Sequence, residues 1–338
     1  MAASNEQSKI VATLNINGKN VPMNAEAFGN YVCSNYRNLN FMWTEQFAHY
    51  RDHHVMAEVL GRLKDGLDEV SCEYIDLHER LVELARSDSA ILVKESYAWT
   101  NVDRALLDNY RQKKEADNPP FLRQVAQDWG SSFTNLYGLY DLPAGMLASL
   151  NGRDIIDAGG FVGDTLLLFK ALFGNSKLHS FEPGDLSYKQ LSNMLADDIK
   201  AGNILAHKKG LGEKPGTIRL SRTRSIPDAT ASMAIDYHKG DDFYEDVEVI
   251  TLDDYVREHN LDVGLIKVDV EGFEPEVIRG ALETIKKSHP VLVLAFYHTP
   301  EEFYELKSYI ESLNLGYRFQ VRRSSICLPL TDLVLIAY

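Results

Sequence analysis

The sequence has few cysteines and no long apolar run. Three cysteines, Cys33, Cys72 and Cys327, lie far apart and in no metal-ligand spacing, which is typical of a reducing compartment. The longest apolar stretch, Val291–Tyr297, is far too short to cross a membrane. The N-terminal segment MAASNEQSKI has none of the apolar character of a secretory signal. The sequence therefore predicts a cytoplasmic protein that is not held in a membrane.

Basic charge is also scarce. The 338 residues include 35 Lys and Arg against 49 Asp and Glu, for a net charge of −14, and acidic residues exceed basic ones in both halves. Nucleic-acid binding draws most of its affinity from Lys and Arg on phosphates, so we expect no nucleic-acid partner. Hydrophobic residues at 45% and charged residues at 25% are ordinary for a globular protein, which excludes a disordered or collagen-like chain.

The length predicts two domains of about 150 residues each, or one large domain with an extension. Residues 10–23 alternate in polarity around Asn17-Gly18, a pair typical of a tight β-hairpin. From about residue 24 to 128, apolar residues recur with helical spacing. We therefore predict that residues 1–140 form a hairpin and a mostly helical cap, and that residues 141–338 form a second domain.

The second half alternates short apolar strands with helices. Strand patterns occur in RDIIDA, KLHSFE, NILAHK, VGLIKVDV and PVLVLAFY, each followed by a helical or irregular segment. This alternation predicts right-handed crossovers and a parallel, doubly wound α/β sheet. The last two strands, GYRFQVRR and TDLVLIAY, have only a short connector, which predicts a closing antiparallel hairpin. Such sheets bind ligands at the carboxyl ends of their strands.

A glycine-rich turn follows the first of these strands. It begins at Asp157 in DAGGFVGDT, where Gly159 and Gly163 allow a tight turn and a close approach of a ligand. A dinucleotide fingerprint needs glycine at position 158, which is Ala158 here. Glu182 ends the next strand and could accept both hydrogen bonds of a ribose diol. Each feature alone has a plain alternative, a turn without a ligand or a surface acid, but together they predict an adenosine-containing cofactor.

Acidic residues follow the fourth strand. Lys267, Asp269 and Glu271 fall on one side of the chain while it stays extended. Ionisable groups at the mouth of a buried strand are costly unless they are paired or functional, and pairing of Asp269 and Glu271 with Lys267 is the structural alternative. Glu274 and Glu276 are expected to be ordinary acids of a helix's first turn.

His298 directly follows the fifth strand. The next residues, Thr299-Pro300-Glu301-Glu302, form a capping-box pattern that places the histidine at the strand mouth, beside a helix start. The alternative is an ordinary loop histidine. Glu45, His49 and His53 recur at helical spacing, but charged neighbours favour a solvated helix face over a metal site.

Residues 222–246 form a long irregular stretch between sheet elements. Such a loop is typical of a lid or an acceptor site. The arginine cluster at its start is expected to be solvated, and it consists of Arg219, Arg222 and Arg224.

Four segments together resemble the FkbM-type family of S-adenosylmethionine-dependent methyltransferases. They are DAGGFVGDT, FEP, ITLDDYV and GLIKVDVEGFEPEVIRGA, and the resemblance covers about residues 150–338. The KxDxEGxE pattern is the most specific part, whereas DxGxxxG is shared by many methyltransferases. Family members often carry an acidic residue late in the fifth strand, where this chain has Leu294–His298, so the interest in His298 rests on its position alone.

The resemblance implies a class I methyltransferase fold with S-adenosyl-L-methionine as cofactor. It implies a Rossmann-like seven-stranded sheet ordered 3-2-1-4-5-7-6 with the last strand antiparallel. Glu182 would hold the ribose, and Gly210–Gly212 would lie near the adenine. The candidate cofactor-binding residues are Asp157, Gly159, Gly160, Phe161, Gly163, Asp164, Thr165, Glu182 and Leu211.

By the same resemblance, the reaction would be O-methylation of a sugar, polysaccharide or natural-product hydroxyl. A hydroxyl is a poor nucleophile until a base takes its proton, so Glu271 or His298 is the candidate base and Asp269 the candidate orienting group. Asp269 and Glu271 suit a divalent metal, but the sequence offers no complete ligand set, and no metal is predicted. The alternatives are an NAD-dependent sugar-modifying oxidoreductase or epimerase and a non-catalytic binding subunit. The acceptor and the oligomeric state stay open.

Overall fold

The computed structural model describes the chain in ten stretches. These are residues 10–16, 19–24, 27, 36–38, 43–86, 92–112, 135–221, 231–233, 244–325 and 329–338. Cys33, Cys327, Arg222, Arg224 and most of the predicted 222–246 loop lie outside the described residues.

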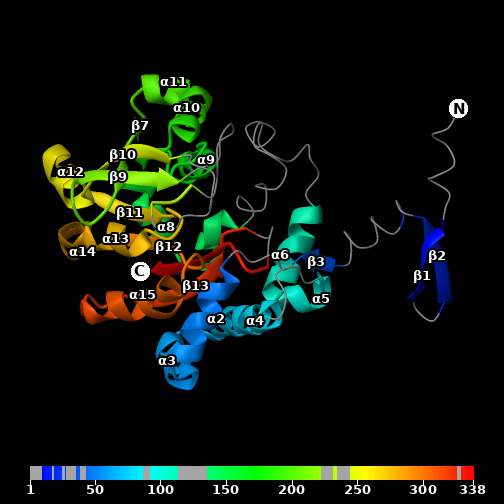
Figure 1. Cartoon of the computed structure of the whole chain (residues 1–338). Coiled ribbons are helices and arrows are strands. Elements are labelled where there is room, and N and C mark those ends of the chain that lie inside the picture. The colour runs from blue at the N-terminus through cyan, green and yellow to red at the C-terminus, as the bar shows by residue number, and fades with distance from the viewer. Residues whose placement is uncertain are drawn as a thin grey trace, which may run out of the picture.

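A seven-stranded sheet forms the centre of the molecule (Figure 1). Its strands in chain order are β5 (Asp154–Ala158), β6 (Leu178–Phe181), β7 (Ile204–His207), β11 (Val263–Val268), β12 (Val291–Ala295), β13 (Phe319–Arg323) and β14 (Leu333–Ala337). They are arranged β13-β14-β12-β11-β5-β6-β7, and β14 runs antiparallel to both neighbours. Counted within the sheet, this is the order 3-2-1-4-5-7-6. The class I methyltransferase fold predicted from the sequence is confirmed.

Helices cover both faces of this sheet (Figure 1). They are α9 (Asp164–Leu172), α10 (Asp185–Met194), α11 (Ala196–Lys200), α12 (Leu252–His259), α13 (Glu274–Arg279), α14 (Leu282–Ser288) and α15 (Pro300–Ser312). Every residue of β11 and β12 is buried, as expected for strands packed on both sides. Neighbouring residues of β5 serve opposite faces: Ile155 packs with Phe169 of α9, and Ile156 packs in the core that contains Phe303 of α15.

A second, three-stranded sheet was not anticipated. It consists of β8 (Gly210–Leu211), β9 (Gly216–Ser221) and β10 (Tyr244–Ile250), in the order β8-β10-β9. The expectation of an irregular stretch up to residue 246 is therefore wrong for its end, because β10 begins at Tyr244. The reason is visible in YEDVEVI, where buried Val247 and Val249 alternate with exposed Asp246 and Glu248, the period of a half-buried strand.

The N-terminal part begins with the predicted hairpin. Strands β1 (Ile10–Ile16) and β2 (Lys19–Asn24) pair antiparallel, with Ile16 opposite Lys19, which confirms the hairpin. The predicted turn pair, Asn17-Gly18, lies outside the described residues. A short pair of strands, β3 and β4, was not predicted. The other elements are β3 (Tyr36–Asn38), α2 (Thr44–His53), α3 (Met56–Lys64), α4 (Glu69–Ala85), β4 (Leu92–Lys94), α5 (Glu95–Ala98), α6 (Asn101–Gln112), the 3-10 helix η4 (Leu136–Asp141) and α8 (Met146–Leu150).

Helices α2, α3 and α4 pack on α15 and β13, so their apolar residues share a core with the large sheet. Phe47 of α2 meets Phe303 of α15 edge to face at 5.9 Å between ring centroids. Arg322 of β13 is buried and donates to Asp68, the N-cap residue of α4, and to Asp141 of η4. The division of the chain at residue 140 stays a prediction.

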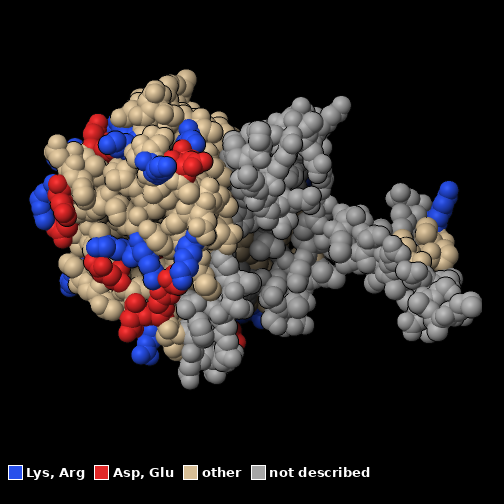
Figure 2. All heavy atoms as spheres, turned by 90° about the horizontal axis from the view of Figure 1, so that it is seen from above, with Lys and Arg blue, Asp and Glu red and all other residues tan. Residues whose placement is uncertain are grey.

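The surface carries both signs of charge. Figure 2 shows Lys and Arg side chains interspersed with Asp and Glu side chains over the described part of one face. On α2, the side chains of Glu45, His49 and His53 are exposed, which confirms the predicted solvated face. Within the described stretches, the structure has no helix of the length and apolar character needed to span a membrane.

Candidate functional site

The glycine-rich turn after β5 packs directly on the loop after β11. Gly159 and Gly163 have φ values of +81° and +95°, in the left-handed region that favours glycine. A Cβ atom on Gly159 would lie 1.7 Å from the backbone oxygen of Asp269, and one on Gly160 would lie 2.2 Å from Ser180 Oγ. Neither position has room for a side chain unless its neighbours move, and the contact at Gly159 holds the turn against the loop after β11.

Glu182 is fixed to this turn by backbone amides. Its Oε2 accepts a hydrogen bond from Phe161 N at 2.8 Å, and its Oε1 accepts one from Gly184 N at 2.8 Å. The residue directly follows β6 and is 8% exposed. Burial raises the pKa of Glu182 to about 7. Each carboxylate oxygen keeps a second acceptor position, which suits the hydroxyls of a ribose.

Asp157 and Lys267 form a buried ion pair, with 3.0 Å between Asp157 Oδ1 and Lys267 Nζ. Ser180 Oγ also donates to Asp157 Oδ2, and Lys267 donates to the Gly159 carbonyl at 2.6 Å. The alternative in which Lys267 pairs with Asp269 and Glu271 is therefore not what the structure shows. Lys267 instead neutralises the first acid of the glycine-rich motif and holds the turn.

Two further candidates directly follow the same turn, and a third lies on β8. Asp164 and Thr165 form the first turn of α9, and burial raises the pKa of Asp164 to about 6. Leu211 lies on β8, is 1% exposed and belongs to the same core cluster as Ile156. Its role beside an adenine stays a prediction.

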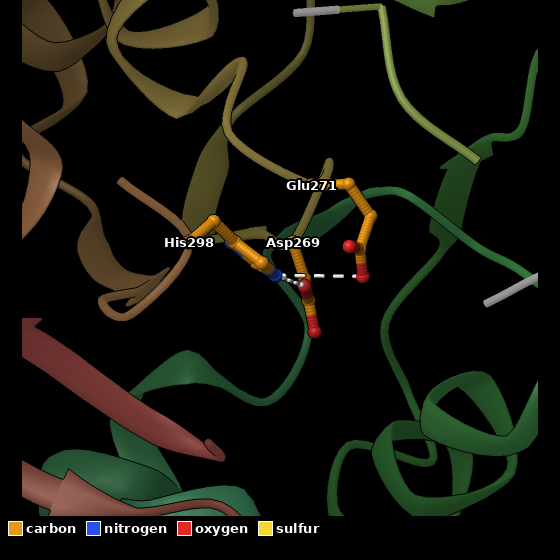
Figure 3. A group of neighbouring side chains, drawn as sticks. All are labelled: Asp269, Glu271 and His298. Carbon is orange, nitrogen blue, oxygen red and sulfur yellow. Dashed lines mark ion pairs between the residues drawn. The ribbon is translucent and has the colours of Figure 1, made fainter. Parts of the chain in front are cut away.

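The predicted catalytic residues converge beside this turn. His298 follows β12, whereas Asp269 and Glu271 follow β11, and Figure 3 shows the edge of the imidazole pointing at both carboxylates. His298 Nε2 lies 3.4 Å from Glu271 Oε1 and 3.7 Å from Asp269 Oδ1. His298 is 0% exposed, so the interpretation as an ordinary loop histidine is wrong.

The backbone reaches this arrangement by a turn rather than by an extended strand. β11 ends at Val268, and Glu271 has a φ of +57°, followed by Gly272 at +94°. The expectation that Lys267, Asp269 and Glu271 share one side of an extended chain is thus wrong. A left-handed non-glycine residue is costly, and such strain is typical of functional sites. Ser232 Oγ donates to the Glu271 carbonyl at 2.6 Å and supports the turn.

Two buried acids on the other side of His298 were missed. Glu274 Oε1 lies 3.3 Å from His298 Nδ1 and accepts from Val270 N, and Glu302 Oε1 lies 3.6 Å from Nδ1 and accepts from Tyr297 N. Both acids are 0% exposed. The prediction of an ordinary first-turn acid is wrong for Glu274. The available sequence signal for Glu274 was its place as the last residue of KxDxEGxE. For Glu302 it was the spacing of four residues from His298.

The capping box is only half formed for the same reason. Thr299 Oγ1 accepts from Glu302 N at 3.1 Å and caps α15 as predicted. The Glu302 side chain does not return to Thr299, because it accepts from Tyr297 N beside the histidine. Glu276, in contrast, is an ordinary surface acid that pairs with Arg279.

The ionisable side chains around His298 change one another's pKa values. Burial alone would lower the pKa of His298, but the carboxylates of Glu271, Glu274 and Glu302 raise it well above the usual value. Burial raises the pKa of Glu271 to about 6, with His298 opposing the shift, and raises that of Glu302 well above its usual value. Four carboxylates around one imidazole require additional positive charge, whether from protons or from a cation.

Residues ahead of the α/β part complete the site. Tyr137 OH donates to Asp269 Oδ2 at 2.8 Å. It lies in η4, where Leu136, Tyr137 and Gly138 have φ values of +49°, +54° and +85°. The Trp43 ring, just before α2, meets the His298 ring edge to face at 5.5 Å. Neither residue lies in a motif, so no sequence signal identified them.

Comparisons with known proteins match the α/β part of this chain to methyltransferases. A family model, the methyltransferase FkbM domain, matches residues 154–319. Among curated relatives, Methyltransferase sdnD of Sordaria araneosa is 29% identical, and Methyltransferase 1 of Beauveria bassiana is 31% identical. These matches cover 38% and 37% of this chain and 60% and 57% of the relatives, so the chain spans less than two thirds of their length.

Among solved structures, the methyltransferase FkbM from Methylobacillus flagellatus KT is 18% identical, with a TM-score of 0.46, and the match covers 70% of this chain and 59% of that one. Fibrillarin from Aeropyrum pernix, solved with S-adenosyl-L-methionine bound, is 15% identical, with a TM-score of 0.34, and covers 60% of this chain and 71% of that one. Residues 154–319, which carry the glycine-rich turn and the acidic loop, form a methyltransferase domain of the FkbM type.

Proposed function

We propose that this chain is an S-adenosylmethionine-dependent O-methyltransferase that acts on a hydroxyl of a sugar, polysaccharide or natural product. The FkbM domain supports methyl transfer, and the two curated relatives are named methyltransferases. One observation carries the proposal: Gly159 lies so close to Asp269 that a Cβ atom added to the glycine would be 1.7 Å from the Asp269 carbonyl oxygen. The proposed cofactor turn and the proposed acceptor cluster therefore share one edge of the sheet.

The residues around the glycine-rich turn fit the cofactor. Gly159 and Gly160 let the turn pack against Asp269 and Ser180, where a Cβ atom would meet protein atoms, and this packing fixes the position of the turn. Glu182 would accept hydrogen bonds from the ribose hydroxyls through the positions that Phe161 and Gly184 leave open. When bound, the sulfonium cofactor supplies an electrophilic methyl group and leaves as a neutral thioether, so no acid is needed for the leaving group.

Glu271 is the base that the geometry favours among the predicted candidates. Its Oε2 is buried and makes no hydrogen bond with any described residue, whereas its side chain remains 16% exposed. His298 is fully buried and faces carboxylates from both ring nitrogens, so it positions Glu271 and Asp269 rather than meeting an acceptor. A base at this position would remove the hydroxyl proton as the oxygen attacks the methyl.

The acceptor class follows from the reaction and from charge. The net charge of −14 disfavours a polyanionic acceptor such as RNA or DNA, so a neutral hydroxylated molecule is the proposed partner. A hydroxyl acceptor must also lose its proton as it attacks the methyl group, which is a step that a carboxylate base can assist.

Methyl transfer from labelled S-adenosylmethionine to a panel of glycans and polyols tests this function. Glu271→Gln should reduce turnover by at least about a hundredfold, the usual contribution of a general base, with cofactor affinity within twofold. Glu276→Gln is the matched control, because Glu276 lies close in sequence but pairs with Arg279. Full turnover of Glu271→Gln would reject the assigned base.

A further inference from the structure

Three donor atoms converge at the centre of the acidic loop. Asp269 Oδ1, Glu271 Oε1 and His298 Nε2 belong to a group whose ligand atoms all lie within 4.8 Å of one another. The nitrogen is 3.7 Å from the first oxygen and 3.4 Å from the second. Donors that share a small divalent cation at about 2.1 Å stand roughly 3 Å apart when adjacent, so a modest closure would complete a site.

His298 provides the independent observation. Both of its ring nitrogens are buried and make no hydrogen bond within the described part of the chain. Buried polar groups are almost always satisfied, and exceptions call for an unseen partner. Nε2 points at Asp269 and Glu271 (Figure 3), and Nδ1 lies closest to Glu274.

This two-sided environment matches that of a metal-bound histidine. A histidine ligand usually directs its second ring N–H at a carboxylate, which fixes the tautomer and the ring orientation. Glu274 and Glu302 supply such carboxylates at 3.3 Å and 3.6 Å from Nδ1, and each is anchored by a backbone amide. Because both acids are fully buried, they suit this orienting role rather than a site with open coordination positions.

The remaining donors are held in place by contacts that leave their inward atoms available. Tyr137 OH donates a hydrogen bond to Asp269 Oδ2, and Asp269 Oδ1 is directed at the histidine. Ser232 holds the Glu271 carbonyl, and the left-handed turn at Glu271 directs its side chain into the cluster. Preorganisation of this kind is what a binding site requires of its supporting residues.

We propose that Asp269, Glu271 and His298 bind a divalent cation, with Mn²⁺ as the matching ion, and that Glu274 orients His298. Two carboxylates and one imidazole suit Mn²⁺ better than Mg²⁺, which prefers oxygen alone. The three ligands leave coordination positions for hydroxyl oxygens. In the proposed methyl transfer, the cation would bind the acceptor hydroxyl and lower its pKa, and Glu271 Oε2, which makes no hydrogen bond within the described residues, would accept the proton. This use rests on the proposed function, but the binding itself does not.

Titration of the chelator-treated full chain with MnCl₂, followed by calorimetry and by the electron paramagnetic resonance of free Mn²⁺, tests the site without an activity assay. We expect one ion per chain. Asp269→Asn and Glu271→Gln should each weaken binding by at least tenfold, and Glu274→Gln by ten- to a hundredfold, the usual effect of an orienting carboxylate. Glu276→Gln should leave affinity unchanged.

A wild-type measurement covers the case in which the variants fail to fold. Bound Mn²⁺ should broaden the imidazole ¹⁵N resonances of His298 and leave those of exposed His49 and His53 sharp. Absence of saturable Mn²⁺ binding, or binding that the Asp269 and Glu271 variants retain, would overturn the site. S-adenosylhomocysteine titrated into the same sample should bind in either case, so failure of the metal site and failure of the proposed function are separable.

Discussion

Glu182 illustrates how burial sets the chemistry of a single residue. Its carboxylate accepts hydrogen bonds from Phe161 N and Gly184 N, yet removal from water raises its pKa to about 7. A carboxylate that must accept hydrogen bonds from two ribose hydroxyls does so best when ionised. Cofactor binding through Glu182 should therefore depend on pH near neutrality.

We predict that S-adenosylhomocysteine binds about tenfold more weakly at pH 6 than at pH 8. Below a pKa of about 7 the carboxyl is protonated in the free protein, and binding must first expel that proton. Calorimetric titration across this range measures the effect. Glu182→Gln should bind more weakly and lose most of the pH dependence, and a steep dependence retained in that variant would assign the effect to another group.

Individual site residues were predictable where a motif specified a backbone requirement or a position at a strand end. Gly159, Glu182 and His298 were placed at the carboxyl ends of their strands in this way. Glu274 was misjudged, because a first-turn position explains an acid without revealing that the side chain is buried. Tyr137 could not be found, since its hydroxyl reaches Asp269 across 132 positions of sequence through a left-handed backbone that the sequence does not signal.

At the scale of elements, the turn after β5 and the loop after β11 are locked together. A Cβ atom at Gly159 would meet the Asp269 carbonyl at 1.7 Å, a backbone atom that cannot move without shifting the loop. The hydrogen bond from Asp269 N to the Ala158 carbonyl, at 3.0 Å, ties the same two segments. The glycine-rich turn and the acidic loop therefore behave as one unit.

Gly159→Ala should lower the free energy of unfolding by about 3 kcal/mol, because left-handed strain and overpacking each cost about 1–2 kcal/mol. Gly152→Ala is the matched control: its φ is +97°, but a Cβ atom there would meet nothing within 4 Å. The control should lose only about 1 kcal/mol in urea denaturation. Equal losses in the two variants would contradict the proposed contact.

The parallel sheet was predictable because parallel strands need crossover helices, which the alternation of KLHSFE, NILAHK and the later strands with helical segments indicates. The order of the strands was implied only by the family resemblance. The small sheet of β8, β9 and β10 was not predictable, since β8 has two residues and pairs in parallel with β10, far away in sequence. Short strands of this kind owe their existence to tertiary pairing rather than to local pattern.

At the scale of the whole molecule, buried charges join the N-terminal helices to the large sheet. Arg323 of β13 is 1% exposed and donates to Asp103 of α6, which is 0% exposed. Asp103 also accepts from Tyr74 OH of α4 and from Thr100 N. The sequence predicted N-terminal helices followed by an α/β sheet. It did not predict the Arg323–Asp103 pair, because these residues lie more than two hundred positions apart.

Asp103→Asn should destabilise the whole chain by about 3–5 kcal/mol, because it removes the carboxylate that pairs with the buried Arg323 guanidinium. Urea denaturation followed by circular dichroism and tryptophan fluorescence measures the loss. Glu258→Gln, on the exposed face of α12, should change stability by less than about 0.5 kcal/mol. A loss in Asp103→Asn as small as in this control would show that the pair does not join the two parts.

The central claim is that the edge of the sheet beside Gly159 binds S-adenosylmethionine. Calorimetric titration of the full chain with S-adenosylhomocysteine, with NAD as competitor, tests it most directly. The account predicts saturable one-to-one binding that NAD does not displace and that Glu182→Ala weakens by at least about tenfold, the cost of losing two hydrogen bonds to a charged group. Binding of NAD in place of S-adenosylhomocysteine, or no binding of either, would contradict it.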